Sequence, residues 1–471
     1  MKTLIDPPQA LAAGLQQLRT EFAVPAGFPP AVLAAAEAAA KRAPTEHVDR
    51  TDRPFVTLDP ARSTDLDQAF AIEAPTAAGG ADLLLHYAIA DVAWFVADSD
   101  PLDREAWARG ETLYLPDGKA SLYPPAIGEG AASLLPDGPR PAVVFTVRVA
   151  PDGAATLDGA ERAIIRSRAK LAYDGVRPDD LPAGFVELAA RIAAAEDARG
   201  AARIDPPQQE VERAPDGGYT LGFAPRLVSE DRNAALSLAT NLAVAAALQA
   251  HGTGLFRVMP PPDARAVARL RHTAQALGLA WPAAQTLDAF GRSLDVANPR
   301  QAAFGLAIRR AGQGAGYQPY RPGVIPWHAA MAATYCHATA PLRRLADRYV
   351  VQAALAIANS RPVPDTVQAA FEKLPPVMAR ADAVAGRLTR AVVDLAEAVM
   401  LAEQVGQTFA AVVTDADAHG ARIQLRDNAV VAHLALRDAT PGRALTVRLT
   451  AADPVKRQVT FEPATQAVPP I

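Results

Sequence analysis

The sequence is poor in cysteine and carries no excess of positive charge. Cys336 is the single cysteine among 471 residues, which excludes an internal disulfide framework and a zinc site built from several thiolates. Such a chain is typical of a reducing compartment, so we expect it in the cytoplasm. The formal net charge of −4 excludes a molecule whose overall field attracts nucleic acid. Binding of a polyanion would therefore need a local group of basic residues.

Long apolar runs are also scarce. The start, M-K-T-L-I-D-P-P, lacks the apolar core of a signal peptide. The most apolar segment, residues 234–250, is interrupted by Ser237, Thr240, Asn241 and Gln249, so we predict a buried helix there and no membrane span. The length is sufficient for about two to four domains with a large core.

Three carboxylates crowd into D-P-A-R-S-T-D-L-D-Q, residues 59–68. Asp59, Asp65 and Asp67 fall among turn formers, between the apolar stretches F-V-T-L and A-F-A-I. This pattern predicts a strand, a loop that carries the acids, and a second strand. Like charges this close repel unless a cation or water separates them, so a hard cation with oxygen ligands, Mg²⁺ above all, would explain the cluster. The alternative is an exposed acidic turn without a ligand.

A second polar segment reads Y-C-H-A-T-A-P-L-R-R-L-A-D-R-Y and lies in the last third of the chain. Thr339 is a good helix N-cap, and the proline two residues later suits a first turn, so we predict that a helix begins here. Arg343 and Arg344 would then lie near the helix N-terminus, where a bound anion such as phosphate would offset their unfavourable position. For Arg344 the alternative is an ion pair with Asp347 on the helix surface.

Basic residues alternate in R-A-I-I-R-S-R-A-K, residues 162–170. If this segment is a strand, Arg166, Arg168 and Lys170 project from one side of it. Such a stripe suits a phosphate backbone. An ordinary solvated strand face is equally consistent with the pattern.

The rest of the pattern indicates an α+β protein with three regions. Residues 1–48 are helical, and form either a small helix-turn-helix-like unit or an arm packed on the main body. Residues 49–402 predict a mixed sheet with surrounding helices. Residues 403–471 contain about five short strands separated by turns, the number found in an OB-fold β-barrel.

The two polar segments resemble the signatures of the ribonuclease II (RNB) family of hydrolytic 3′→5′ exoribonucleases. The first matches the family's Asp, its Ser-Thr pair and its D-x-D-D run, except that Gln68 replaces the fourth acid. The second matches T-S-P-I-R-R-Y-x-D, with Ala340 and Leu345 in place of Ser and Tyr. The C-terminal strands are similar to the OB-fold RNA-binding domain repeated in a ribosomal protein. The resemblance therefore implies an RNB catalytic domain followed by an RNA-binding barrel.

The resemblance also implies a reaction. Single-stranded RNA would enter 3′ end first and be hydrolysed to nucleoside 5′-monophosphates by a two-metal mechanism. The metal ligands would be Asp59, Asp65, Asp67 and Gln68, with Asp67 and Arg343 as the catalytic residues. Because a carboxamide offers one neutral oxygen, we expect a higher Mg²⁺ requirement or a preference for Mn²⁺.

RNA contacts follow from the same resemblance. Tyr114, in R-G-E-T-L-Y-L-P, matches a tyrosine that stacks on the 3′-terminal nucleotide, and Arg343 matches an arginine that binds the phosphate at the scissile end. The resemblance adds His337, Thr339 and Arg344 to this set, and the alternating basic residues described above, Arg166, Arg168 and Lys170, complete the predicted RNA-binding residues. For Tyr114 and His337 the alternative is a structural role.

An alternative function is a non-catalytic RNA-binding or regulatory protein whose weakened RNB site no longer cuts. Fewer than 60 residues precede Asp59, too few for the two cold-shock barrels that family members commonly carry there. We therefore expect a different RNA entrance, wide enough for structured RNA with a 3′ overhang. We also expect a monomer whose partner is the RNA 3′ end, without a membrane.

Overall fold

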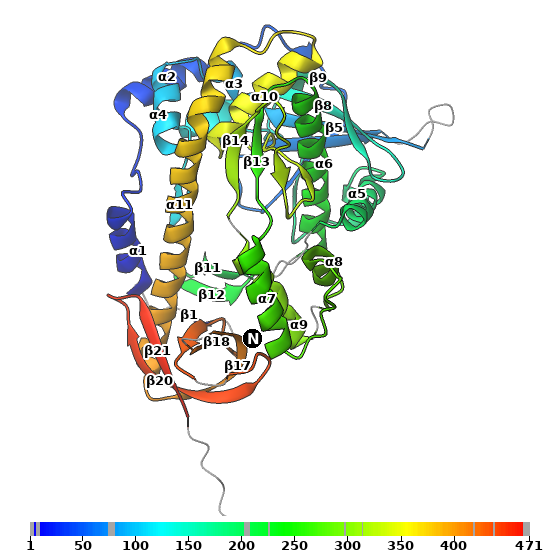
Figure 1. Cartoon of the computed structure of the whole chain (residues 1–471). Helices are drawn as coiled ribbons and strands as arrows, with labels where there is room; N and C mark the ends of the chain where they lie inside the picture. Colours follow the sequence, from blue (N-terminus) through cyan, green and yellow to red (C-terminus); the bar gives the residue numbers. More distant parts are fainter. Residues whose placement is uncertain are drawn as a thin grey trace, which may run out of the picture.

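The computed structural model describes residues 4–5, 10–73, 81–201, 208–224, 227–295, 298–312, 314–417, 420–436 and 439–464. The ends of the predicted terminal regions, residues 1–3, 6–9 and 465–471, lie outside this set. Figure 1 shows a large α/β body, a small β-barrel at the opposite end, and the long helix α11 (Asp365–Leu401) between them. The predicted α+β architecture is confirmed.

A seven-stranded sheet forms the centre of the body, in the order β10-β3-β4-β5-β8-β9-β2. Neighbours are antiparallel from β3 to β9 and parallel at the two ends, where β10 pairs with β3 and β2 with β9. The strands are β2 (Val48–Asp49), β3 (Phe55–Asp59), β4 (Gln68–Glu73), β5 (Leu83–Ala90), β8 (Arg140–Val149), β9 (Ala155–Ile165) and β10 (Ser167–Ala172). The central strand β5 reads L-L-L-H-Y-A-I-A and is buried almost throughout, as expected for a strand covered on both faces.

Two strands on opposite sides of this sheet are consecutive in the chain: β10 is one edge strand, and β9 lies next to the other edge strand, β2. β9 ends at Ile165, β10 begins at Ser167, and Arg166 alone separates them. Ala172 of β10 pairs with Asp59 at the end of β3. The predicted acidic loop, residues 60–67, therefore leaves the sheet beside the end of β10.

Helix α6 (Val228–Ala250) is the core helix of the body, as predicted for residues 234–250. It packs against β5, β8 and β9 and against α5 (Phe185–Arg199). By length and composition alone it would also suit a membrane span, but most of it is buried inside the fold. A core helix of this kind is apolar around most of its circumference.

Shorter elements complete the fold. The remaining helices are α3 (Val92–Phe95), α4 (Pro101–Arg109), α7 (Ala264–Ala276), α8 (Leu287–Arg292), α9 (Pro299–Ala311) and α10 (Leu345–Ala358). The small sheets are formed by β1 (Leu4–Ile5), β11 (Gln209–Arg213) and β12 (Tyr219–Phe223), by β6 (Leu113–Leu115) and β7 (Gly118–Ala120), by β13 (Leu255–Val258) and β14 (Gly316–Pro319), and by β15 (Trp327–His328) and β16 (Ala333–Thr334).

The two N-terminal helices pack in different places. Leu11, Leu15 and Leu18 of α1 (Ala10–Glu21) are buried at helical spacing against α11, in the core shared with the barrel. Helix α2 (Pro30–Ala40) packs on α4 and on a π-helical turn at Ala126–Ala131, in the core of the body. Figure 1 shows α1 alongside α11 and α2 beside α4. The two helices therefore pack on different parts of the fold, α1 in the core shared with the barrel and α2 in the core of the body.

Five strands form the predicted C-terminal barrel, in the order β19-β18-β17-β20-β21. They are β17 (Thr408–Asp417), β18 (Gly420–Leu425), β19 (Val431–Leu434), β20 (Ala444–Asp453) and β21 (Gln458–Pro463). The two edge strands β19 and β21 approach each other, so the barrel is nearly closed. Inward residues such as Val413, Ile423 and Val447 alternate with outward ones, as in any small filled barrel.

Buried polar contacts join α11 to the barrel. The Oε1 atom of Glu397 accepts hydrogen bonds from Gln209 Nε2 at 2.6 Å and from the Val431 amide at 2.9 Å. Burial raises the pKa of Glu397 to about 7. One carboxyl group of the connecting helix thus holds β19 and the β11 strand together.

Candidate functional site

The acidic loop is held by a neighbouring segment. The Leu66 amide donates to Ser133 Oγ at 2.9 Å, Ser133 Oγ donates to the Thr64 carbonyl at 2.8 Å, and the Leu134 amide donates to the Leu66 carbonyl at 3.0 Å. Because Ser133 is fully buried, these bonds are shielded from water. The loop therefore presents Asp65 and Asp67 in a defined geometry.

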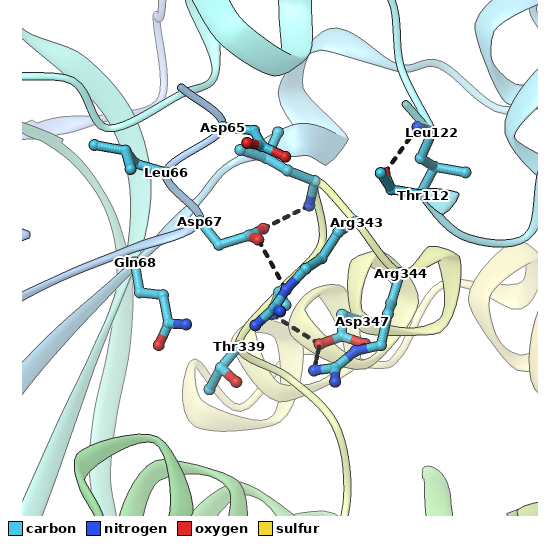
Figure 2. A network of polar contacts seen from close by, with 12 residues as sticks. Asp65, Leu66, Asp67, Gln68, Thr112, Leu122, Thr339, Arg343, Arg344 and Asp347 are labelled. Carbon is cyan, nitrogen blue, oxygen red and sulfur yellow. Dashed lines mark hydrogen bonds and ion pairs between the residues drawn. The ribbon is translucent and has the colours of Figure 1, made fainter. Parts of the chain in front are cut away.

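Asp67 meets the second polar segment directly. Its Oδ1 accepts the Leu342 amide at 2.7 Å, and its Oδ2 lies 3.4 Å from Arg343 Nε (Figure 2). The two residues of that hydrogen bond are 275 positions apart in the chain. The fold thus brings the predicted acidic loop and the predicted arginine to one place.

Two of the acids have raised pKa values. Burial raises the pKa of Asp59 to about 7 and that of Asp67 to about 8, although the Arg343 guanidinium lowers both. The negative charge of Asp65 raises both pKa values further. A cation bound between these carboxylates would relieve that unfavourable charge.

Asp65 already has a cation beside it. Lys119 Nζ lies 2.6 Å from Asp65 Oδ1 and 3.0 Å from Glu129 Oε1. The hydroxyl of Tyr114 also lies 3.4 Å from Asp65 Oδ2. Lys119 and Glu129 were not predicted as site residues from the sequence. A signal for Lys119 existed, because the turn residues P-D-G between two extended pieces predict a hairpin, and in it Tyr114 pairs with Lys119.

Gln68 is turned to another partner. Its Oε1 accepts a hydrogen bond from the hydroxyl of the buried Tyr87 on β5. Figure 2 shows the Gln68 amide pointing away from the Asp65 and Asp67 carboxylates. The position predicted as a fourth metal ligand is therefore occupied by an oxygen that is already hydrogen-bonded. Tyr87 was not predicted, because a tyrosine within an apolar strand gives no sign of a polar partner.

Tyr114 projects from β6 next to Arg343. It is 54% exposed, which is unusual for so large a ring. Both residues line a cavity of about 240 Å³, whose other walls are Glu111, Thr112, Leu113, Arg344, Ala385, Leu388 and Thr389. The Thr112 amide donates to the Arg343 carbonyl at 3.0 Å, and the Leu345 amide donates to the Gly110 carbonyl at 2.9 Å. These bonds join the tyrosine-bearing strand to the arginine-bearing turn.

The helix start predicted at Thr339 is wrong. Helix α10 begins at Leu345 and has no side-chain cap. The hydroxyl of Thr339 is buried and lies 2.9 Å from Ser237 Oγ and 3.3 Å from Asn241 Nδ2, both on α6. Tertiary contacts with α6 therefore prevail over the local capping preference. Arg343 lies in the turn before the helix.

The predicted ion pair of Arg344 with Asp347 is confirmed, but its predicted place on the helix surface is wrong. Arg344 forms two parallel bonds with Asp347, at 3.0 Å and 2.8 Å. Asp347 is completely buried, so this pair is not on the helix surface as expected. Asp347 also accepts the Ala340 amide at 2.8 Å, and so shapes the turn that carries Arg343.

His337 lies behind the turn. Its Nδ1 is 2.8 Å from the hydroxyl of Tyr317, and the rings of Tyr317 and Tyr335 meet it edge-on. Burial and the nearby arginines hold the pKa of His337 well below its usual range. The ring is therefore neutral, and its contacts fit the structural alternative.

The predicted basic strand face is only partly present. Arg166 lies between two strands, so the three residues do not share the face of one strand as expected. Arg168 donates to the Asp52 carbonyl, and Lys170 Nζ donates to the Ala61 carbonyl at 2.8 Å. The positive charge of Lys170 lowers the pKa of Asp59, which shows that Lys170 lies close to the acidic loop. Arg166 and Arg168 are exposed.

The acidic residues could bind a divalent cation, but fewer of their oxygen atoms are free than the sequence predicted. Within the part of the chain that the structure describes, no three His, Cys, Asp or Glu side chains are arranged as a ready metal-binding group. Burial is the main cause of the raised pKa values of Asp59 and Asp67, and a bound divalent ion would favour the ionised form of both carboxyl groups. The oxygens of Asp65 and Gln68 already have partners.

Two segments of the chain match known domain families. Residues 47–358 match the RNB domain, and residues 407–464 match the RNase II-type exonuclease C-terminal S1 domain. The chain is 26% identical over 444 residues to ribonuclease R of Aquifex aeolicus (strain VF5). The aligned region covers 87% of this chain and 61% of that protein. The chain thus spans less than two thirds of that relative's length.

Solved structures share the fold. Mycoplasma genitalium RNase R in complex with ribose-methylated single-stranded RNA is similar with a TM-score of 0.83 at 19% identity, over 97% of this chain and 78% of that one. Yeast Ssd1, a pseudonuclease, is similar with a TM-score of 0.65 at 16% identity, over 84% of this chain and 50% of that one. The RNB domain extends over most of the sequence, and the residues that resembled its two signatures meet in space. The chain therefore belongs to the RNB family.

Proposed function

We propose that this protein is a hydrolytic 3′→5′ exoribonuclease that degrades single-stranded RNA to nucleoside 5′-monophosphates. The observation that carries the proposal is the junction of Asp67 with Leu342 and Arg343, beside the cavity that Tyr114 lines. The similarity to an RNase R bound to single-stranded RNA supports this substrate. The proposal also includes structured RNA with a 3′ overhang as a substrate. It further includes a protein that acts as a monomer in the cytoplasm.

In this mechanism the exposed ring of Tyr114 stacks on the 3′-terminal base. Stacking accepts every base, because every base has a π-face, and it is worth roughly 1–3 kcal/mol. The Arg343 guanidinium, held near Asp67 but 44% exposed, donates to the oxygens of the scissile phosphate. The two residues thereby fix the terminal nucleotide and its phosphate at one distance from the acidic loop.

The acidic loop supplies the negative charge for a divalent cation. Asp59 and Asp67 would hold Mg²⁺, or Mn²⁺ in its place. The bound ion would activate water and offset charge on the phosphate. Lys170 and Arg168 would contact the RNA backbone nearby. Three residues would act indirectly, by holding the turn of Arg343 in place. Arg344 bonds to Asp347, Thr339 to α6, and His337 to Tyr317.

A second candidate is a non-catalytic RNA-binding or regulatory protein. Two observations favour it: Gln68 replaces an acid and is hydrogen-bonded to Tyr87, and Asp65 is paired with Lys119. The similarity to a pseudonuclease shows that the fold alone does not establish cutting. The two candidates share the RNA path and differ in the chemistry at its end.

Degradation of labelled RNA separates the two. We expect the full chain with Mg²⁺ to release mononucleotides from the 3′ end of a 5′-labelled single strand, and EDTA to stop the release. Asp67→Asn should still bind RNA but should lose more than about 100-fold in rate, because the residue loses charge at the ion. Tight RNA binding without any product, at high Mg²⁺ and high Mn²⁺, would establish the non-catalytic candidate.

A further inference from the structure

The ammonium group of Lys119 is fixed within the acidic site. It contacts Asp65 Oδ1 at 2.6 Å, Glu129 Oε1 at 3.0 Å and Thr64 Oγ1 at 3.4 Å. An ammonium group has three N–H donors and no acceptor, so three oxygens match its full capacity. The side chain is 21% exposed and that of Asp65 is 14% exposed, so water competes weakly for these contacts.

The backbone around Lys119 makes this position rigid. β6 and β7 form a hairpin with a two-residue loop, in which Tyr114 pairs with Lys119. Arg19 forms two bonds with Asp117 in that loop, at 2.9 Å and 2.7 Å, which tie the hairpin to α1. Glu129 comes from the π-helical turn, so Lys119 joins its own hairpin to two other segments, this turn and the acidic loop.

The charges divide the site into two halves. Lys119 balances Asp65 and Glu129. Asp59 and Asp67 lie opposite each other at adjacent ends of β3 and β4, because these antiparallel strands pair Val56 with Phe70. Asp67 has a longer contact of 3.4 Å with Arg343 Nε. Gln68 brings no charge, and its oxygen is engaged by Tyr87. A divalent ion at Asp59 and Asp67 would have two facing carboxylates as ligands, whereas a second ion at Asp65 would have to displace a fixed cation.

We propose that Lys119 takes the place of one of the two divalent ions, so that the site binds a single ion at Asp59 and Asp67. This inference rests on the proposed function, because it concerns the same acidic site. It also explains why Gln68 can replace the family's fourth acid. With the ammonium group of Lys119 already present, no further carboxylate is needed to balance a second divalent ion. Lys119 is a positioning residue that orients Asp65, which in turn borders Tyr114.

Counting bound ions tests this inference without reference to activity. Titration of the full chain with Mn²⁺, followed by electron paramagnetic resonance and calorimetry, should give one ion per chain that is lost in Asp67→Asn. Lys119→Met frees Asp65 and Glu129 and should bind two ions, with the spectral broadening of a close Mn²⁺ pair. Lys119→Arg keeps the charge and should bind one. Lys456→Met, which removes an exposed lysine of the barrel, is the matched control and should also bind one.

Two ions in the unaltered chain, both lost in Asp67→Asn, would overturn the inference even if Lys119→Met failed to fold. A count of one in folded Lys119→Met would overturn it as well. Failure of the proposed function has a different signature. If the unaltered chain binds one Mn²⁺ and degrades no RNA, the ion count stands and the nuclease assignment falls.

Discussion

At the scale of single residues, the site depends on which oxygen atoms are free. Asp67 uses one oxygen to accept the Leu342 amide and keeps the other near Arg343. Gln68, the next residue, points to Tyr87. Neighbours in the sequence therefore contribute in different ways, because successive side chains point to opposite sides of an extended chain.

Gln68→Asp should lower the Mg²⁺ concentration that half-saturates RNA degradation, because the variant adds a negative charge next to the acidic loop. Gln68→Glu keeps the length that reaches Tyr87 and is the matched control for charge alone. The measurement is a Mg²⁺ titration of the initial rate. An unchanged titration in both variants would place position 68 outside the ion site.

Tyr114→Ala should weaken binding of single-stranded RNA about 5- to 150-fold, which corresponds to the loss of roughly 1–3 kcal/mol of base stacking. Tyr114→Phe should bind nearly as well as the unaltered chain, because the 3.4 Å contact of the hydroxyl with Asp65 is long. Fluorescence anisotropy with labelled RNA in EDTA measures binding without cleavage. Equal affinity of the Ala and Phe variants would show that the ring does not stack.

At the scale of elements, a short ladder between residues 110–112 and 343–345 joins the tyrosine hairpin to the arginine turn. Gly110 ends α4 with φ +77°, a conformation that L side chains rarely adopt. A Cβ there would lie 2.8 Å from the Cβ of Ala381 on α11. A glycine is therefore needed both for the turn and for the close approach of the long helix.

Gly110→Ala should lower the free energy of unfolding by about 1–3 kcal/mol, because it combines backbone strain with a steric overlap. Gly386→Ala is the matched control: that glycine lies inside α11, and an added Cβ would meet nothing. The control should raise stability by roughly 0.5–1 kcal/mol through helix propensity. Chemical denaturation measures both, and equal effects of the two changes would refute the strain argument.

Much of this architecture was predictable from local sequence. The acidic loop between two strands, the buried helix α6 and the five-stranded barrel all follow from hydrophobic periodicity and turn residues. The start of α10 was not predictable, because the hydroxyl of Thr339 bonds to α6 and does not cap a helix. The Lys119 contact with Asp65 was missed for a similar reason, since it joins segments 54 positions apart.

At the scale of the whole molecule, α11 connects the body with the barrel, and Glu397 is the buried acid at that junction. Its pKa is about 7 in the folded protein and ordinary when unfolded. The folded state therefore binds the proton more tightly. The contribution of this group to stability is full below its unfolded pKa and is lost as the pH rises through about 7.

Glu397→Gln should remove this pH dependence and keep both hydrogen bonds, because they end on Oε1 alone. The difference in unfolding free energy between the two proteins should grow in favour of Gln from pH 5 to pH 8. Glu397→Ala leaves the Val431 amide without its acceptor and should cost about 1–3 kcal/mol. Denaturation curves at several pH values test both variants, and a difference independent of pH would mean that Glu397 does not titrate in this range.

The ladder between Tyr114 and Arg343 has a consequence for how the protein would move along its substrate. Because backbone hydrogen bonds join the two segments, the backbones that carry Tyr114 and Arg343 keep a fixed spacing. Under the proposed function, a 3′-terminal nucleotide without a base would keep its phosphate contact with Arg343 and lose its stacking on Tyr114. We therefore expect degradation to slow where a base is missing.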